Sequence, residues 1–334
     1  MNAATSRKDD FAMDQQVDRP ADVAANLGAG APVSRFAPIL ARLKLPPARA
    51  LFDSLWPPFA GVLGFLALWA MLAPLVKTSL GTLPGPGDVW EAFKGLMVEY
   101  SATRAAAAEA VAAGSTYTGP PTFIDQIFTS LETVAMGFIL ATLFAVPLGL
   151  IAGMSKRINA AINPLVQILK PISPLAWLPI VTMVVSASIT GDNPALPKSF
   201  VISSVVVMLC SLWPTLINTA IGTASIDKDL LNVGRVLKLG WFARLTKLVL
   251  PSSLPYIFTG MRLSLGVGWM VLIAAEMLAQ NPGLGKFVWD EFQNGNEKSL
   301  ARIMVAVVVI GLIGFALDRI MMALQALVSR NRTF

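Results

Sequence analysis

Long apolar segments alternate with short polar ones along most of the chain. Six of them approach or exceed the length of about 20 residues that a helix needs to cross a membrane. Only helices or closed barrels satisfy their own backbone hydrogen bonds inside lipid, so the pattern predicts an all-α membrane protein with about six transmembrane helices. The expected spans are residues 56–76, 131–153, 164–187, 200–222, 254–279 and 303–324.

The third span, 164–187, differs from the others because Pro171, Pro174 and Pro179 interrupt it. Proline is tolerated inside a membrane helix where neighbouring helices satisfy the freed carbonyls. A packed kink is one interpretation. The alternative is a break that lines a substrate pathway, which the position of Trp177 between two of the prolines favours.

A polar insert at residues 225–255 separates the fourth and fifth spans. It reads SIDKDLLNVGRVLKLGWFARLTKLVLPSSLP and carries five Lys/Arg and two Asp. Apolar residues recur in it at helical spacing, which predicts an amphipathic element that ends at Leu250–Pro251 and docks a soluble partner. The alternative is a helix lying flat on anionic lipid. The residues that define its two apolar faces are Leu230, Val233, Val236 and Leu237, then Leu245, Leu248 and Val249.

The composition agrees with a membrane protein and excludes several other classes. Hydrophobic residues make up 55% of the chain and charged residues 14%, against about 25% charged in ordinary soluble domains. The single cysteine, Cys210, allows no disulfide within the chain, and histidine is absent. With no P-loop Lys-Ser/Thr and no metal-ligand spacing, we expect a non-catalytic chain that holds no cofactor or metal of its own.

Basic residues predict the orientation, because cytoplasmic loops carry an excess of Lys and Arg. Both termini and the insert are expected in the cytoplasm, and the net charge of +6 reflects this topology rather than nucleic-acid binding. We expect a disordered or interfacial N-terminal tail at 1–50, with a helix at 36–51 on the membrane surface. The first span and an outer segment follow at 51–125, and the other spans at 126–330. The basic residues assigned to the cytoplasm are Arg35, Arg42, Lys44, Arg49, Lys156, Arg157, Lys228, Arg235, Lys238, Arg244, Lys247, Arg330 and Arg332.

Ionisable residues inside the spans are few and are therefore candidates for a role in transport. Glu276 is either a hydrogen-bond partner for a neighbouring helix or a pathway group. Arg262 either anchors the inner end of the fifth span or attracts an anion, and Lys170 has similar alternatives. Hydroxyl and indole groups could also line a pathway for a weakly hydrated anion; the candidates of this kind are Thr133, Ser173, Trp177 and Thr182.

The insert also carries a resemblance to a known family. The run from Asn232-Val-Gly-Arg235 to Leu250-Pro251 resembles the cytoplasmic signature loop of permease subunits of bacterial ATP-binding cassette importers, and the likeness extends over 123–330 through segments such as INPLVQILKPISPLAWLPI. The chain departs from the family's Glu and Gly positions with Asn232 and Lys238. The resemblance implies a type I ABC-importer transmembrane domain at 126–330 and a coupling loop for the ATPase. Its expected residues are Leu230, Asn232, Val233, Gly234, Arg235, Leu237, Lys238, Gly240, Trp241, Leu250 and Pro251.

Within that family, the motifs NVxRVLxL, PYIFTGMRL, AAEML and GxGxFVWDEF look like the nitrate/nitrite branch. The resemblance implies a homodimer in a bacterial inner membrane, with ATPase subunits that bind ATP and Mg and an outer solute-binding protein. The expected function is nitrate import, with bicarbonate, cyanate or a sulfonate such as taurine as alternatives. A channel or secondary transporter that needs no ATPase is the alternative from another class.

Overall fold

The computed structural model describes residues 48–78, 81–115, 119–189, 191 and 196–330. The chain divides into two compact units, residues 1–63 and 64–334. Within the first unit the structure describes the start of helix α2 (Ala48–Leu72), which contains Pro57 and Pro58. The expected N-terminal tail and its surface helix, apart from the first residues of α2, lie outside the described residues.

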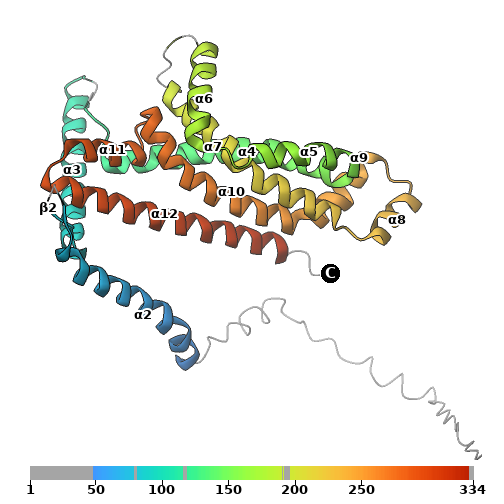
Figure 1. Cartoon of the computed structure of the whole chain (residues 1–334), viewed down its shortest axis with the longest axis horizontal. Coiled ribbons are helices and arrows are strands. Elements are labelled where there is room, and N and C mark those ends of the chain that lie inside the picture. The colour runs from blue at the N-terminus through green and yellow to red at the C-terminus, as the bar shows by residue number, and fades with distance from the viewer. Residues whose placement is uncertain (1–47, 79–80, 116–118, 190, 192–195, 331–334) are drawn as a thin grey trace, which may run out of the picture. The chain divides into compact units, whose positions relative to one another are not determined.

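In the described part of the second unit, the regular structure is helical apart from one small hairpin (Figure 1). After α2 come the 3₁₀ turn η1 (Ala73–Leu75), the antiparallel strands β1 (Lys77–Thr78) and β2 (Gly81–Thr82), α3 (Pro86–Ala112), α4 (Phe123–Met154), α5 (Lys156–Leu169), α6 (Pro174–Ser188) and α7 (Lys198–Ala224). The remaining elements are α8 (Lys228–Val236), α9 (Trp241–Arg244), the π-helical turn η2 (Leu245–Val249), α10 (Leu250–Ala279), α11 (Leu284–Asn294) and α12 (Glu297–Arg330).

Helix α7 is the centre of the bundle, with α4 packed along one side and α10 along another. Small residues permit the close approach: a Cβ on Gly149 of α4 would lie 2.6 Å from the Thr219 Cβ of α7 and 2.8 Å from the Leu216 carbonyl. Small side chains at crossing points are typical of helix pairs in membranes, where van der Waals packing replaces the hydrophobic effect. Helices α3 and α11 lie at one end of the bundle and α8 and α9 at the other (Figure 1).

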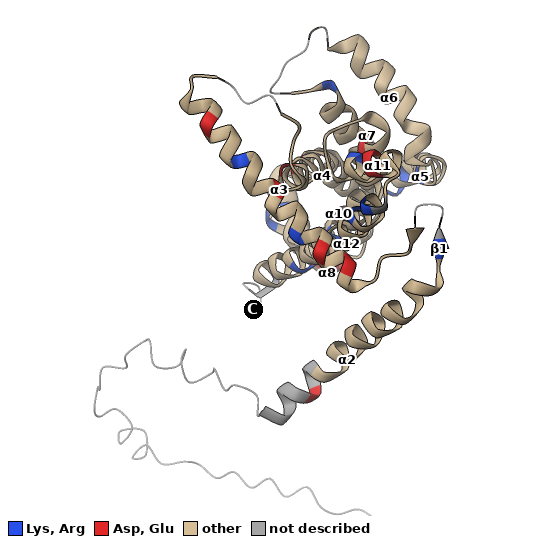
Figure 2. Ribbon diagram, turned by 90° about the vertical axis from the view of Figure 1, so that its left-hand side faces the viewer, with Lys and Arg blue, Asp and Glu red and all other residues tan. Residues whose placement is uncertain are grey.

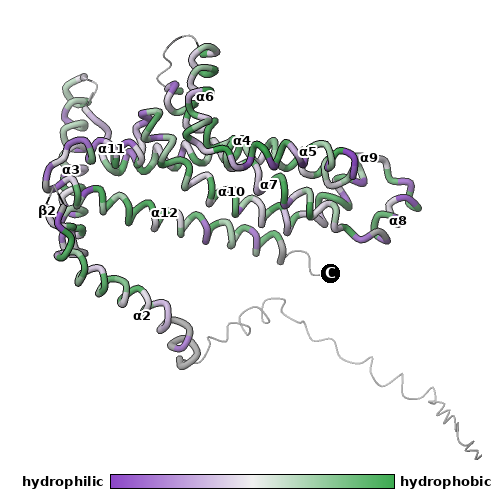
Figure 3. The backbone as a smooth tube through the Cα atoms, viewed as in Figure 1, coloured by the Kyte–Doolittle hydropathy of each residue, from purple (hydrophilic) through white to green (hydrophobic). Residues whose placement is uncertain are grey.

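Among the described residues, five helical segments are long and apolar enough to cross a membrane: Trp56–Leu75, Phe123–Met154, Lys198–Ala224, Trp241–Ala279 and Lys298–Val328. These correspond to five of the six expected spans. Figure 3 shows apolar residues along the long helices, and polar residues gathered towards the α3–α11 end and the α8 end. The fold is therefore that of a multi-pass membrane protein.

The expected third span, 164–187, requires correction. Two helices occupy the region, α5 and α6, and they are bent by 101° with respect to each other. Pro171 and Pro174 lack the backbone N–H that would continue the helical hydrogen bonds, and Pro174 also disfavours helical geometry at Ser173, which is extended. The pair counts as a sixth span only if the two bent helices cross together.

Candidate functional site

The insert forms a projecting loop at the α8 end of the bundle (Figure 1). Helix α8 begins where the Asp227 carboxylate accepts the N–H of Asp229 at 2.9 Å, a side-chain cap that satisfies a free donor of the first turn. Asn232, at the family's Glu position, accepts a bond from Arg235 Nη1 at 3.0 Å on the exposed surface of the same helix. The first amphipathic run of the sequence is therefore a short helix held by local contacts.

The expectation that the insert ends at Leu250–Pro251 is wrong. A single apolar helical segment runs from Trp241 to Ala279, and Pro251 lies in the first turn of α10 within it. The π turn η2 ends at Val249, two residues before that proline. Because a π turn shifts the hydrogen bonds from i→i+4 to i→i+5, the backbone accommodates a residue with no N–H without ending the helix.

Lys238 forms the turn between the two short helices. Its φ of 47° is in the left-handed region, where glycine is the usual residue. Lys238 N–H donates to the Arg235 carbonyl at 2.9 Å, and Leu239 N–H donates to the Gly234 carbonyl at 3.0 Å. These two bonds are the Schellman arrangement that ends helices at a left-handed residue. The turn expected of the family's glycine is thus present, with lysine in that conformation.

Gly234 sets how closely α8 approaches η2. A Cβ at this position would lie 2.7 Å from Leu248 Cδ1, closer than side chains ever pack. Beyond Leu248, the buried Val249 packs with Leu150 of α4 and Ile257 of α10. The second apolar run of the insert therefore packs on its own bundle, and it joins α8 to the long helices.

The first apolar run remains uncovered. Val233, Val236, Leu237 and Trp241 are all exposed, Val236 by 80% and Trp241 by 61%, while Leu230 is partly buried. Arg235, Lys238 and the turn residue Gly240 are exposed beside them. A cluster of apolar side chains with a charged rim, on a polar projecting loop, is typical of a protein-interaction surface. We call the exposed residues 233, 236, 237 and 241 the loop patch.

Glu276 lies at the opposite end of the bundle and is fully buried. Its carboxylate oxygens lie 2.8 and 2.9 Å from the hydroxyl of Ser130 in α4, and Oε2 accepts the N–H of Gly285 at 3.0 Å. Ser130 Oγ also accepts the N–H of Leu284 at 2.8 Å. Leu284 and Gly285 open α11, so a buried carboxylate and a hydroxyl satisfy the free donors at its positive end.

A second polar group continues this contact between helices. Asn281 Nδ2 donates to Thr133 Oγ1 at 3.1 Å, and the Thr133 hydroxyl donates to the Thr129 carbonyl at 2.7 Å. The Ser199 hydroxyl lies 3.4 Å from Asn281 Oδ1. Thr133 is fully buried, so in this chain it lies in the helix-joining network. Glu276 and Thr133 were candidates from the sequence, whereas Ser130, Asn281 and Ser199 were not, because short polar residues in apolar spans carry no distinctive pattern.

Arg262 of α10 forms a bidentate ion pair with Asp318 of α12. The Nε–Oδ1 and Nη2–Oδ2 distances are 2.5 and 3.0 Å. Parallel N–H···O bonds of this kind fix both partners in orientation as well as in charge. Arg262 lies in the interior of α10, with its carboxylate partner 56 residues away in the sequence, and that partner was not singled out beforehand.

The other pathway candidates lie at the break between α5 and α6. Lys170 and Ser173 are exposed, and the Ser173 hydroxyl accepts the N–H of Leu175 at 3.3 Å to cap α6. Within the described chain, the buried indole Nε1 of Trp177 has no hydrogen-bond partner. Thr182 is partly buried further along α6. The seven candidates thus occupy three settings rather than one site.

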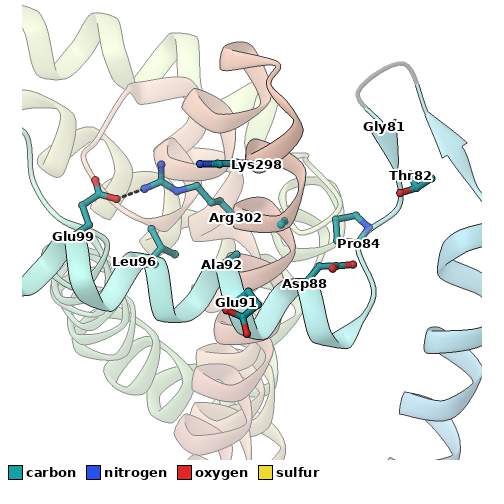
Figure 4. Close-up of a pocket in the computed structure, with 12 residues that line it drawn as sticks. Gly81, Thr82, Pro84, Asp88, Glu91, Ala92, Leu96, Glu99, Lys298 and Arg302 are labelled. Atoms are coloured by element: carbon teal, nitrogen blue, oxygen red, sulfur yellow. Dashed lines mark hydrogen bonds and ion pairs between the residues drawn. The ribbon is translucent and has the colours of Figure 1, made fainter.

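A cluster of ion pairs lies beside α3 at the α11 end of the bundle. Arg302 Nη2 donates to Glu99 Oε2 at 2.5 Å, and its Nη1 lies 3.1 Å from Glu291 Oε1, so one guanidinium joins α12, α3 and α11. Figure 4 shows Arg302 pointing towards Glu99, and both residues line a cavity of about 730 Å³ together with Asp88 and Glu91. Charges of both signs follow α3 (Figure 2). None of these residues was a candidate from the sequence.

Arg104 joins α3 to α4 through Asp125, with Nη2 2.8 Å from Oδ1. The side-chain hydrogen bond with Tyr100 and then the charge of Asp125 raise the pKa of Arg104 above its ordinary value. Among the described residues no group of three or more His, Cys, Asp or Glu could hold a metal ion.

Apolar helices of membrane-spanning length, with an amphipathic loop that projects from one end, define the class of a multi-pass membrane protein. Residues 145–333 match the family model of the binding-protein-dependent transport system inner membrane component, more than half of the chain. The chain belongs to this family of ABC importer permeases. It is a non-catalytic subunit with the type I transmembrane fold, it lies in the inner membrane, and partner ATPases hydrolyse the ATP.

Individual relatives divide between two substrates. The bicarbonate transport system permease protein CmpB of Synechococcus elongatus is 34% identical over 286 residues, which cover 85% of this chain and 92% of the relative. The nitrate import permease protein NrtB of the same species is 37% identical over 204 residues, 61% of this chain and 69% of the relative. NrtB of Synechocystis sp. is also 37% identical, over 61% of this chain and 69% of its own length.

Proposed function

We propose that this permease carries nitrate inward across the membrane and that ATP hydrolysis by its partners drives the movement. The observation that carries the choice of nitrate is the higher identity to the nitrate import permeases, 37% against 34% for the bicarbonate permease. The nitrate-type motifs of the α8–α10 and α10–α11 regions support the same substrate. Nitrite, which shares the charge and planar shape of nitrate, belongs to the same proposal.

Bicarbonate is the second candidate, and a specific observation favours it. The likeness to the bicarbonate permease extends over 85% of the chain, whereas the likeness to the nitrate permease covers 61%. Both substrates are small planar oxyanions with a single negative charge. The two proposals therefore share the same route and the same partners, and they differ only in the anion.

The partners follow from the proposed coupling. Two copies of the chain would form the pathway, with an ATPase subunit on each loop patch and a solute-binding protein at the α11 end. The loop would then lie in the cytoplasm with both termini, as its basic residues favour. The exposed apolar residues of the patch would enter a groove on the ATPase, while Arg235 and Lys238 would meet acidic groups at its rim.

Movement of the ATPase would reach the membrane through the contact of Gly234 with Leu248. Because the segment from Trp241 to Ala279 is one continuous helix, displacement of α8 acts on a rod that reaches the α11 end. Alternating access then requires two packings of this rod that ATP binding biases. The ATPase binds ATP and Mg in this scheme, and the permease binds neither.

The test is the stimulation of ATP hydrolysis by substrate in the reconstituted complex of permease, ATPase and solute-binding protein. The proposal predicts that nitrate raises the ATPase rate several-fold, and that bicarbonate, cyanate and taurine at equal concentration leave it near the basal rate. Stimulation by bicarbonate alone would transfer the assignment to the second candidate. Transport of an anion by the permease without any ATPase would contradict the proposal that ATP hydrolysis drives transport, whichever anion is carried.

A further inference from the structure

The break between α5 and α6 leaves backbone groups without partners. Residues 170–173 are not helical, and within the described chain the carbonyls of Lys170, Pro171 and Ile172 accept no hydrogen bond. In hydrocarbon, a backbone carbonyl that accepts no hydrogen bond raises the free energy by several kcal/mol, because no water is present to bond it. Non-helical backbone at membrane depth occurs only where protein buries it or where it lines a water-filled cavity.

The break lies deep in the membrane-spanning part of the bundle. Val166, one turn before it, packs with Ala141 and Ala145 of α4 and with Leu212 and Leu216 of α7. Helix α5 has 14 residues and begins beside the end of α4 at Met154, so the break is about 21 Å from that end at 1.5 Å per residue. In a hydrocarbon core of about 30 Å, this position is well inside. Figure 1 shows α6 leaving the bundle midway along its length.

Lys170 carries its charge at this depth without a partner. Its side chain is exposed, and the described residues give it neither an ion pair nor a hydrogen bond. The other two ionisable pathway candidates differ: Arg262 is paired with Asp318, and the buried Glu276 is bonded to Ser130 and Gly285. A lysine near a helix end can extend to the interface, but a stem of about 6 Å does not reach it from this depth.

We propose that residues 170–173 line a water-filled pathway and that the Lys170 ammonium is the cationic contact for the transported anion. The anionic nature of the substrate rests on the proposed function; the exposure to water rests on the break alone. Water in the pathway hydrates the three carbonyls and the ammonium, which removes the cost that lipid would impose. The alternative is that a second copy of the chain buries the break and excludes water from it. The test below distinguishes the two.

An ammonium at a helix break suits a small oxyanion that must be released again. The lysine ammonium is a compact charge with three hydrogen-bond donors. Unlike the planar guanidinium of arginine, it does not bind an oxyanion through two parallel hydrogen bonds, so it attracts the anion and holds it less tightly. Favourable entry with weak retention is what conduction through a pathway requires. Loss of the charge is therefore expected to slow transport at least tenfold at low substrate concentration, with binding to the solute-binding protein unchanged.

The test uses the full permease with its ATPase and solute-binding protein in proteoliposomes, in a Cys210→Ala background that removes the natural cysteine. Lys170→Cys is treated with sulfonatoethyl methanethiosulfonate, a water-soluble anion, or with aminoethyl methanethiosulfonate, which restores an ammonium. Leu312→Cys is the matched control, since Leu312 is 63% exposed on the apolar surface of α12.

The proposal predicts that the sulfonate reagent labels Lys170→Cys and not Leu312→Cys, and that the aminoethyl reagent restores transport to Lys170→Cys while the sulfonate reagent does not. Restoration in the same molecules shows that the variant was folded. No labelling at position 170 in an active complex would mean a dry protein contact and would overturn the proposal, as would unchanged anion transport by Lys170→Cys. If the unsubstituted complex carries no anion, the proposed function fails instead, whatever the labelling.

Discussion

The Glu276 carboxylate lies 2.8 Å from the Ser130 hydroxyl, so that one polar contact joins α10 to α4 where α11 begins. No room is left beside it: a Cβ on Gly283 would overlap the carboxyl group of Glu276. The carboxylate thus sets the position of three helices at the end of the bundle away from the loop patch. In the proposed coupling, movement of the helical segment Trp241–Ala279 reaches α4 and α11 at this end of the bundle.

Replacing Glu276 separates a hydrogen-bonding role from a role of its charge. Glu276→Ala leaves the Gly285 N–H and the Ser130 hydroxyl without their acceptor, at a cost of about 1–3 kcal/mol for each buried group. Glu276→Gln keeps one acceptor oxygen for these donors, places an NH2 group where the second oxygen was, and loses the interaction with the α11 dipole, worth about 0.3–1 kcal/mol. We expect a large fall in the melting temperature of the detergent-solubilised protein for Ala and a small one for Gln. Exposed Glu132 on α4 is the control, and an equal fall for Glu132→Ala would contradict this account.

Enlarging Gly234 should uncouple ATP hydrolysis from transport. A leucine there would clash with Leu248 and push α8 away from η2, because even a Cβ would lie only 2.7 Å from Leu248 Cδ1. We expect Gly234→Leu to assemble with the ATPase and to lose most of its transport per ATP hydrolysed. The double variant Gly234→Leu with Leu248→Ala restores the space and should recover much of the coupling. Wild-type coupling in the single variant would contradict the proposal that movement passes through the contact of Gly234 with Leu248.

Lys238 carries strain that a glycine would relieve. A left-handed conformation costs a non-glycine residue about 1–2 kcal/mol, part of which the greater freedom of unfolded glycine offsets. Lys238→Gly should slow hydrogen exchange at the Leu239 amide, by up to about fivefold, and β-branched Lys238→Val should accelerate it at least tenfold. Lys238→Asn accepts the conformation without the charge. If both Gly and Asn weaken ATPase binding while the turn stays intact, the ammonium itself contacts the partner.

The pair of Arg262 and Asp318 should tolerate exchange better than loss. Either Arg262→Ala or Asp318→Ala leaves one charge unpaired between α10 and α12 within a membrane span, which is costly there. We expect each single variant to yield several-fold less monodisperse protein in size-exclusion chromatography. The exchange Arg262→Asp with Asp318→Arg keeps the opposite charges adjacent and should recover part of the yield. A double variant no better than the singles would indicate that the surroundings, rather than the pair, fix these residues.

Five of the six expected spans and the amphipathic insert could be predicted from the sequence, because hydropathy and helical periodicity are local properties. Val233, Leu237 and Trp241 are exposed on the loop, as an element that binds a partner would require, and their role in binding the ATPase stays a prediction. The end of the insert was not predicted, because a Leu-Pro pair usually stops a helix and the π turn that accommodates Pro251 depends on packing against α4 and α10.

The contacts between distant residues could not be predicted from a single sequence. Arg302 and Glu99 are 203 residues apart, and nothing in either neighbourhood indicates the other. Asp318 follows an apolar run that reads as an ordinary span, so its pairing with Arg262 depended on how α12 packs on α10. The unpaired Lys170 was flagged only as a charge beside prolines, and its exposure at depth required the 101° bend.

The most direct test of the central claim is uptake of isotope-labelled nitrate into proteoliposomes that contain the permease, its ATPase and its solute-binding protein. We predict accumulation that requires ATP on the side of the loop patch, ceases when ATP is replaced by a non-hydrolysable analogue, and falls strongly in Gly234→Leu. Nitrate uptake that is independent of ATP, or ATP-driven uptake of bicarbonate with none of nitrate, would contradict the account.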